Sequence, residues 1–144
     1  MNVTDLIANR TEIFSISIEA TVHDAAKYLR EKQIRSAGVL DAHSKLVGVI
    51  SQSDISDKVA AENKCPAWTR VTEIMSTQPV TVSPETSLDE CARLMDKHGF
   101  FHLAVVDPVK GFRGLISVQD LLKVIASDHK ARADMLEAYM FPSR

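Results

Sequence analysis

The chain has 144 residues and a mass of 15.9 kDa, with a formal net charge of −2 and a pI near 6.2. This charge argues against a nucleic-acid-binding protein, because neutralising a phosphate backbone takes a basic face. No apolar run approaches the roughly 20 residues of a membrane span, and residues 1–14 lack the basic start and apolar stretch of a signal peptide. We therefore expect a soluble, cytoplasmic protein with a buried core and no membrane partner.

The elements predicted along the chain follow one order, and they follow it twice. A short capped turn at residues 3–7 (VTDLI) precedes a predicted strand at 13–16, and a similar turn at 71–75 (VTEIM) precedes a strand at 79–82. A helix is predicted after each strand, because apolar residues recur at spacings of three and four and form one buried stripe. The two stripes consist of Val22, Ala25, Ala26 and Leu29, and of Leu88, Cys91, Ala92 and Met95.

A hairpin and a second helix complete each half. The hairpin strands are AGVLD and KLVGVI in the first half, and LAVVD and GFRGLI in the second. Both hairpins end in the same heptad, Gly-apolar-Ile-Ser-x-x-Asp, which occupies residues 48–54 and 114–120. We expect the second helix of each half to start at the aspartate of this heptad, Asp54 or Asp120.

The two halves are copies of one unit. Residues 20–55 align with 86–121 at an offset of 66 without a gap, and self-similarity of this kind outweighs local propensity. One unit of about 60 residues is marginal alone, and its apolar hairpin strands bury their second face only when the two sheets pack together. The sequence therefore predicts an α/β fold of the α+β type, with two β-α-β-β-α repeats packed as a single pseudo-twofold body.

The alignment also predicts the boundaries of the units. Repeat 1 covers 1–62, a linker covers 63–70, repeat 2 covers 71–127 and a helical tail covers 128–144. Trp68 in the linker either covers the exposed end of the core or belongs to a partner surface. The tail carries one apolar helical stripe, which either packs on its own module, exchanges within a dimer or docks on a partner.

The repeated heptad has a structural interpretation and a functional one. In the first, each serine caps a helix, and duplication alone explains the recurrence. In the second, the amides and the positive end of the helix hold a phosphate, while Asp54 and Asp120 accept hydrogen bonds from the two hydroxyls of a ribose. The sequence places no base beside the serines that would make them nucleophiles, so it does not indicate an enzyme.

Three sequence patterns recur in both halves: the openings VTDLI and VTEIM, the segments RSAGVLD and HLAVVD, and the GxISxxD heptads. Together they resemble a tandem pair of cystathionine β-synthase (CBS) domains, also called a Bateman module, over residues 3–126. The resemblance implies a regulatory module without a catalytic cofactor, which binds AMP, ADP, ATP, NAD or S-adenosylmethionine and signals to a partner. It also implies a homodimer, and we expect the regulated protein to be a separate chain.

The resemblance further implies two binding sites, each shared between the repeats, with the aspartate of one repeat on the ribose and the other repeat around the base. The Asp54 site consists of Ser51, Ser53 and Asp54 with Val80, Phe100, Phe101 and His102. The Asp120 site consists of Ser117, Gln119 and Asp120 with Phe14, Ile34, Arg35 and Ser36. We expect at least one site to be occupied, with AMP, ATP or NAD as the leading ligands.

Some of these residues have a second interpretation. Arg35 is either a phosphate ligand or a solvated charge, and His102 is either a ligand or a surface histidine. Phe100 and Phe101 are either contacts for the base or one core and one rim aromatic. A metal pair of His98 and His102 is disfavoured, because a glycine interrupts the helix between them.

The rival function is a scaffold that dimerises or docks through its helices and tail, with vestigial sites and no ligand. The two functions differ in one measurable property, because a ligand that binds only the folded protein raises its melting temperature. A nucleotide screen by thermal shift therefore separates them.

Overall fold

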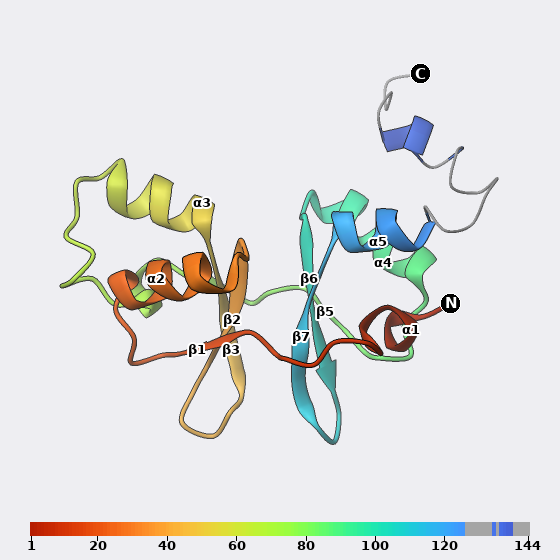
Figure 1. Cartoon of the computed structure of the whole chain (residues 1–144), viewed down its shortest axis with the longest axis horizontal. Coiled ribbons are helices and arrows are strands. Elements are labelled where there is room, and N and C mark those ends of the chain that lie inside the picture. The colour runs from red at the N-terminus through yellow and green to blue at the C-terminus, as the bar shows by residue number, and fades with distance from the viewer. Residues whose placement is uncertain (126–133, 135, 140–144) are drawn as a thin grey trace.

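The computed structural model describes residues 1–125, 134 and 136–139, and most of the predicted tail, 128–144, lies outside these residues. The described residues form two halves, each with a small sheet, and the two sheets lie next to one another in the centre with helices on the outer faces (Figure 1). Each half has the order β-α-β-β-α, which confirms the predicted fold class. Within these ranges, no helix is both long enough and apolar enough to cross a membrane.

The first half contains a four-stranded sheet in the order β1-β2-β3-β4. β1 runs parallel to β2, β2 and β3 form an antiparallel hairpin, and β4 adds antiparallel to β3. The strands are β1 (Ser15–Ser17), β2 (Ser36–Leu40), β3 (Leu46–Ser51) and β4 (Ser76–Thr77). The helices are α2 (Val22–Lys32) and α3 (Gln52–Ile55), and a π-helical turn at Ser56–Ala60 continues α3.

The second half contains a three-stranded sheet in the order β5-β6-β7. β5 runs parallel to β6, and β6 and β7 form the antiparallel hairpin. The strands are β5 (Thr81–Val82), β6 (His102–Asp107) and β7 (Gly111–Ser117). The helices are α4 (Leu88–His98) and α5 (Val118–Ile125).

The first strand of each half begins two residues later than the sequence predicts. Phe14 and Val80 precede β1 and β5, and each joins the sheet only through its carbonyl. That of Phe14 accepts from the Gly38 N–H at 3.3 Å, and that of Val80 accepts from the Ala104 N–H at 3.0 Å. Regular pairing with the neighbouring strand starts at the next residue, Ser15 or Thr81. The apolar residues that predicted each strand therefore begin before the strand itself.

Both second helices begin two residues before the predicted aspartate. Ser51 is the N-cap of α3: its hydroxyl accepts from the Asp54 N–H, and the Asp54 carboxylate accepts from the Ser51 N–H. Ser117 and Asp120 make the same two hydrogen bonds at the start of α5. The serine therefore ends the strand and starts the helix, and the capping interpretation of the heptad is confirmed in both halves.

Each half is completed by the opening segment of the other repeat. Helix α1 (Val3–Ile7) packs in the second half, where Val3 is fully buried and its N–H donates to a carbonyl of the loop before α4 at 2.9 Å. A 3-10 turn at Val71–Glu73 packs in the first half, where the Val71 N–H donates to the Ala20 carbonyl at 3.1 Å. Figure 1 shows α1 beside the second sheet, although it opens the chain.

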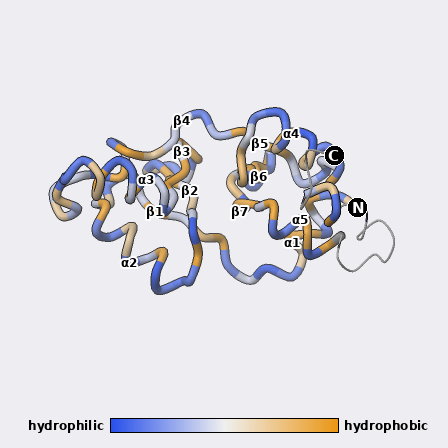
Figure 2. The backbone as a smooth tube through the Cα atoms, turned by 90° about the horizontal axis from the view of Figure 1, so that it is seen from above, coloured by the Kyte–Doolittle hydropathy of each residue, from blue (hydrophilic) through white to orange (hydrophobic). Residues whose placement is uncertain are grey.

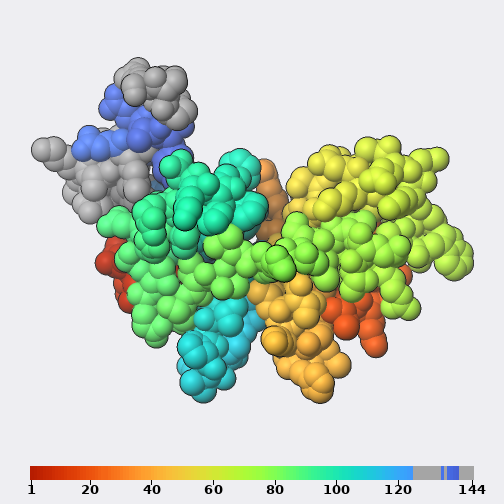
Figure 3. Space-filling view, turned by 180° about the vertical axis from the view of Figure 1, so that it is seen from behind, coloured from red at the N-terminus to blue at the C-terminus, as the bar shows by residue number. Residues whose placement is uncertain are grey.

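The two halves meet where β2 contacts β7. Gly38 in β2 has no side chain, and the Phe112 ring of β7 fills that space, because a Cβ at residue 38 would lie 2.5 Å from Phe112 Cζ. Apolar stretches line each half separately in Figure 2, and Figure 3 shows a notch in the surface between the halves. The largest fully buried side chains include Ile50 and Ile74 in the first core and Leu103, Ile116 and Leu121 in the second.

Trp68 does not cover the core. Its side chain is 85% exposed, so that alternative is wrong. The Cys65 carbonyl accepts hydrogen bonds from the N–H groups of both Trp68 and Thr69, each at 3.1 Å, and in this turn it is Thr69 that is buried. The tryptophan of the linker therefore belongs to the surface.

Candidate functional site

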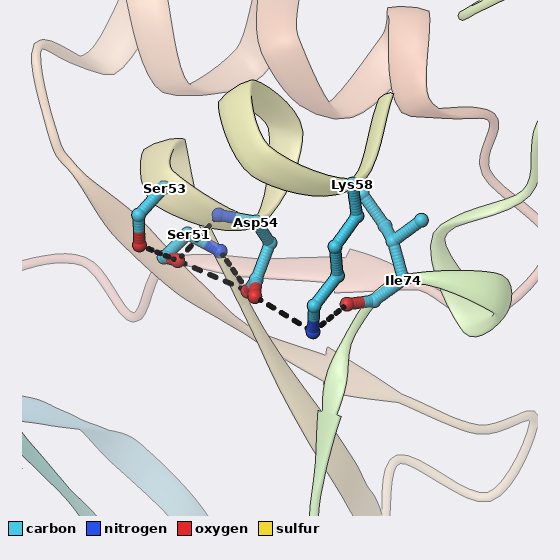
Figure 4. Close-up of polar contacts among 5 residues, drawn as sticks. All are labelled: Ser51, Ser53, Asp54, Lys58 and Ile74. Atoms are coloured by element: carbon cyan, nitrogen blue, oxygen red, sulfur yellow. Dashed lines mark hydrogen bonds and ion pairs between the residues drawn. The ribbon is translucent and has the colours of Figure 1, made fainter. Parts of the chain in front are cut away.

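At the end of β3, the Asp54 carboxylate is enclosed by contacts within its own half (Figure 4). Oδ2 accepts hydrogen bonds from the N–H and the hydroxyl of Ser51, both at 3.0 Å, and Oδ1 lies 3.1 Å from Lys58 Nζ. Lys58 also donates to the Ile74 carbonyl at 3.0 Å, and the Ser53 hydroxyl lies 3.0 Å from that of Ser51. Asp54 is 8% exposed, so both of its oxygens are buried and engaged.

Asp120 takes the same place in the second half but is more open. Its Oδ2 accepts from the Ser117 N–H at 2.8 Å and lies 3.0 Å from Arg10 Nη2. Arg10 Nη1 also donates to the Leu115 carbonyl at 2.5 Å. Within the part of the chain that the structure describes, Asp120 Oδ1 has no hydrogen-bond partner, and the side chain is 29% exposed. Asp120 is therefore less enclosed than Asp54.

The pKa of His102 depends on charged residues of both halves. It opens β6 and pairs across the hairpin with Ser117. Burial lowers the pKa of its imidazole; the Asp120 carboxylate opposes this shift, and the Arg35 guanidinium adds to it. Arg35 precedes β2 in the first half and is exposed. The charge of Arg35 in the first repeat thus affects the pKa of His102 in the second repeat, which the Asp120 carboxylate affects in the opposite direction.

The other residues predicted for the Asp120 site lie on separate elements and differ in burial. Phe14 and Ile34 are partly buried and pack against the first core. Ser36 is half-buried at the start of β2, and Gln119 is exposed in the first turn of α5. Val80 is predicted for the Asp54 site but packs against the second core. Among the described contacts, it makes none with Asp54.

Phe100 and Phe101 are both on the surface, at 48% and 73% exposure, so the alternative of one core and one rim aromatic is wrong. Both follow the end of α4, where Gly99 caps the helix with a left-handed backbone and φ of +68°. The Phe100 ring stacks on His98, with centroids 5.9 Å apart and planes 11° apart. Among the described residues, no group of His, Cys, Asp and Glu side chains has the arrangement of a metal site.

Sequence reasoning missed the two basic residues that contact the aspartates. Lys58 follows Asp54 by four positions, which is the spacing of neighbours on one helix face, and this signal was available. Arg10 is separated from Asp120 by 110 positions and lies where the two repeats lose their alignment. Its contact had no periodic signal in the sequence.

A cavity of about 390 Å³ lies elsewhere, between β5 and α4, where Thr81, Glu90 and Leu94 line it. None of the predicted site residues is among its lining residues. In the first half, Tyr28 corresponds to Leu94, and its hydroxyl accepts from the Ser15 N–H at 3.3 Å. The two halves thus differ at this position, with a cavity-lining leucine in the second and a hydrogen-bonded tyrosine in the first.

Solved structures similar to this chain are CBS domain proteins. A CBS-domain protein from Burkholderia ambifaria is 31% identical with a TM-score of 0.82, and the match covers 90% of this chain and 97% of that one. The CBS domain pair of protein MJ0100, in complex with 5′-methylthioadenosine and S-adenosylmethionine, is 27% identical with a TM-score of 0.76, over 86% and 98%. CBSX2, in complex with AMP, is 26% identical with a TM-score of 0.73, over 88% and 96%.

The curated relatives are longer than this chain, which spans 21% to 60% of the first three. An inosine-5′-monophosphate dehydrogenase from Nitrosopumilus maritimus is 32% identical over 108 residues, which are 75% of this chain and 21% of that protein. The CBS domain family matches residues 3–61 and, separately, residues 71–127. Each match contains one β-α-β-β-α unit, so the chain is a tandem pair of such domains and belongs to the CBS domain family.

Proposed function

We propose that this chain is a regulatory module that binds an adenosine-containing nucleotide at the Asp120 site. The observation that carries the proposal is the carboxylate of Asp120, which the helix cap holds in place while Oδ1 stays unbonded and the side chain 29% exposed. A carboxylate accepts hydrogen bonds from the two neighbouring hydroxyls of a ribose. The choice of ligand is supported by the two similar proteins solved with AMP and with 5′-methylthioadenosine and S-adenosylmethionine.

The other parts of the ligand are assigned from the chemistry around Asp120. The first turn of α5 presents the positive end of the helix dipole, and Arg35 adds a full positive charge. Both favour the phosphate of the nucleotide. Phe14 and Ile34 supply partly buried apolar surface, which suits the adenine ring. AMP, ATP and NAD all carry this combination of groups.

The Asp54 site is proposed to bind more weakly. A ribose there has to displace Ser51 or Lys58, because these two residues occupy both carboxylate oxygens. Asp54 is also buried, so the exchange costs desolvation as well as hydrogen bonds. We therefore expect one tight site and one weak site per chain, with the tight one at Asp120.

Isothermal titration calorimetry with AMP, ATP, NAD and S-adenosylmethionine tests the assignment. We expect Asp120→Ala to weaken nucleotide binding at least tenfold, because it removes hydrogen bonds to a charged group. Asp89→Ala, an exposed aspartate in the first turn of α4, is the matched control and should bind as the wild type does. Unchanged affinity in a folded Asp120→Ala protein would refute the assignment.

Regulation follows if the ligand binds one arrangement of the two repeats more tightly than another. We propose that the module acts as a homodimer and that a separate protein senses the change in its arrangement. Analytical ultracentrifugation of the wild type with and without AMP tests the first part. A chain that stays monomeric at all concentrations contradicts it.

A scaffold without a ligand is the second candidate function, and exposed aromatic side chains favour it. Phe101 is 73% exposed and Trp68 is 85% exposed, and aromatic residues of this kind are enriched in protein–protein interfaces. The scaffold predicts that no nucleotide raises the melting temperature at millimolar concentration. It also predicts that Phe101→Ser or Trp68→Ser abolishes self-association.

A further inference from the structure

We infer that Arg10 makes the Asp120 site selective for adenosine ligands that carry a phosphate. This inference rests on the proposed function and adds to the site a residue that the sequence did not predict there. Arg10 Nη2 lies 3.0 Å from Asp120 Oδ2, and Nη1 donates to the Leu115 carbonyl at 2.5 Å. The guanidinium thus lies on the carboxylate that is assigned to the ribose.

Arg10 covers a strand edge that the first half covers with a strand. In the first half, Val49 of β3 pairs with Ser76 of β4. The corresponding residue of β7 is Leu115, and its carbonyl accepts from the Arg10 side chain instead. The neighbouring Gly114 also faces Arg10, whose Nη1 would lie 3.5 Å from a Cβ at that residue. A side chain leaves such an edge by rotating its own bonds, whereas a paired strand cannot.

Arg10 also supplies the counter-charge that the helix lacks. Asp54 pairs with Lys58, which is four residues further along the same helical segment. The position four residues after Asp120 holds Val124, an apolar residue. The positive charge on Asp120 therefore comes from Arg10, whose side chain is 32% exposed. The second half thus takes its counter-charge from a residue 110 positions away, whereas the first half takes it from its own helical segment.

A ribose that bonds to Asp120 competes with this ion pair and frees the guanidinium next to the ligand. Arg10 and Arg35 then lie on the same site, and two guanidinium groups match a doubly charged 5′-phosphate. A thioether at the 5′ position offers them no charge, and the sulfonium of S-adenosylmethionine repels them. The chemistry therefore favours AMP over 5′-methylthioadenosine and S-adenosylmethionine.

The test is the ratio of the dissociation constants for 5′-methylthioadenosine and AMP, measured by calorimetry on the wild type and on Arg10→Ala. Removing Arg10 frees Asp120 for both ligands alike, so this effect cancels in the ratio. The lost phosphate contact affects AMP alone. We expect Arg10→Ala to lower the preference for AMP roughly tenfold, and Arg10→Lys to retain part of it.

Arg93→Ala is the matched control, because this exposed arginine pairs only with Glu90 among the described contacts, on the outer helix α4. Its ratio should equal that of the wild type. If Arg10→Ala keeps the wild-type ratio while Asp120→Ala loses AMP, the inference about Arg10 fails and the proposed function stands. If the wild type binds none of AMP, ATP, NAD, S-adenosylmethionine and 5′-methylthioadenosine, both fail.

Discussion

Gly38 and Phe112 are in contact across the junction of the two halves: a Cβ at residue 38 would lie 2.5 Å from ring atom Cζ and 2.6 Å from Cε2. These distances are too short for real carbon atoms, so the ring occupies the place of a side chain. The interior of a protein is too densely packed to absorb even one extra methyl group without cost. The junction therefore depends on the absence of a side chain at one position.

We expect Gly38→Ala to lower the free energy of unfolding by about 1–3 kcal/mol, because the Phe112 ring has to move away from β2. Urea denaturation measures this change. Phe112→Leu removes the ring atoms concerned, so the double mutant should lose less than the two single mutants together. Strict additivity would show that the two halves do not meet at these residues.

The two aspartates should differ in their effect on stability. Asp54→Ala removes a nearly buried carboxylate that accepts from the Ser51 N–H, and it leaves Lys58 without its ion pair. We expect it to cost about 2 kcal/mol. Asp120 is more exposed, and its replacement by alanine should cost about 1 kcal/mol or less. The midpoints of urea unfolding test this order, and a reversed order would show that the buried contacts of Asp54 stabilise the fold less than those of Asp120.

His102 should make stability depend on pH. Burial lowers its pKa in the folded chain, whereas the unfolded chain keeps the ordinary value of 6.5. Between the lowered pKa and 6.5, the unfolded chain binds more protons, so the free energy of unfolding falls as the pH drops below 6.5. His102→Gln should remove this part of the pH dependence. Unfolding curves above and below pH 6.5 measure it.

The neighbours of His102 give a directional check by NMR titration of the imidazole. Arg35→Gln removes a positive charge and should raise the pKa of His102, while Asp120→Asn removes a negative charge and should lower it. An unchanged pKa in both variants would mean that neither charge acts on the imidazole.

The two cysteines should react with thiol reagents at very different rates. Cys65 is exposed, whereas Cys91 is buried in the second core, where burial raises the pKa of its thiol to about 11. Only the thiolate reacts, so we expect one modified cysteine per native chain and two in urea. Mass spectrometry counts the adducts. Cys65→Ser should leave the native chain unmodified, and rapid labelling of that variant would show an accessible Cys91.

The repeat made most of the fold predictable. Helices α2 and α4 carry the expected apolar stripes, with Leu29 and Met95 buried at their ends, and the hairpins lie where the alignment places them. The strand and helix boundaries were displaced by two residues, because hydrophobicity does not reveal where pairing starts or which residue of Ser51 and Asp54 caps the helix. The local sequence pattern therefore predicts which elements form more accurately than it predicts the residues at which they begin.

The exchange of opening segments and the contacts of Arg10 were not predictable in this way. A short helix with one buried valine, such as Val3, has no local feature that tells which of two similar cores it enters. Arg10 contacts a carbonyl 105 positions away and an acid 110 positions away, and only the folded chain brings them together. The site residues that occur in both repeats were therefore predictable from the sequence, whereas a residue that occurs in only one repeat, such as Arg10, was not.

The exchanged openings, α1 in one direction and Val71–Glu73 in the other, have a consequence for any polypeptide that holds a single repeat. Such a polypeptide carries an opening segment that packs into a second copy. It lacks the opening segment that would pack into its own core. Two separate copies can satisfy each other only by associating, and their association depends on concentration. Covalent linkage within one chain removes that dependence, because each copy is permanently at a high effective concentration for the other.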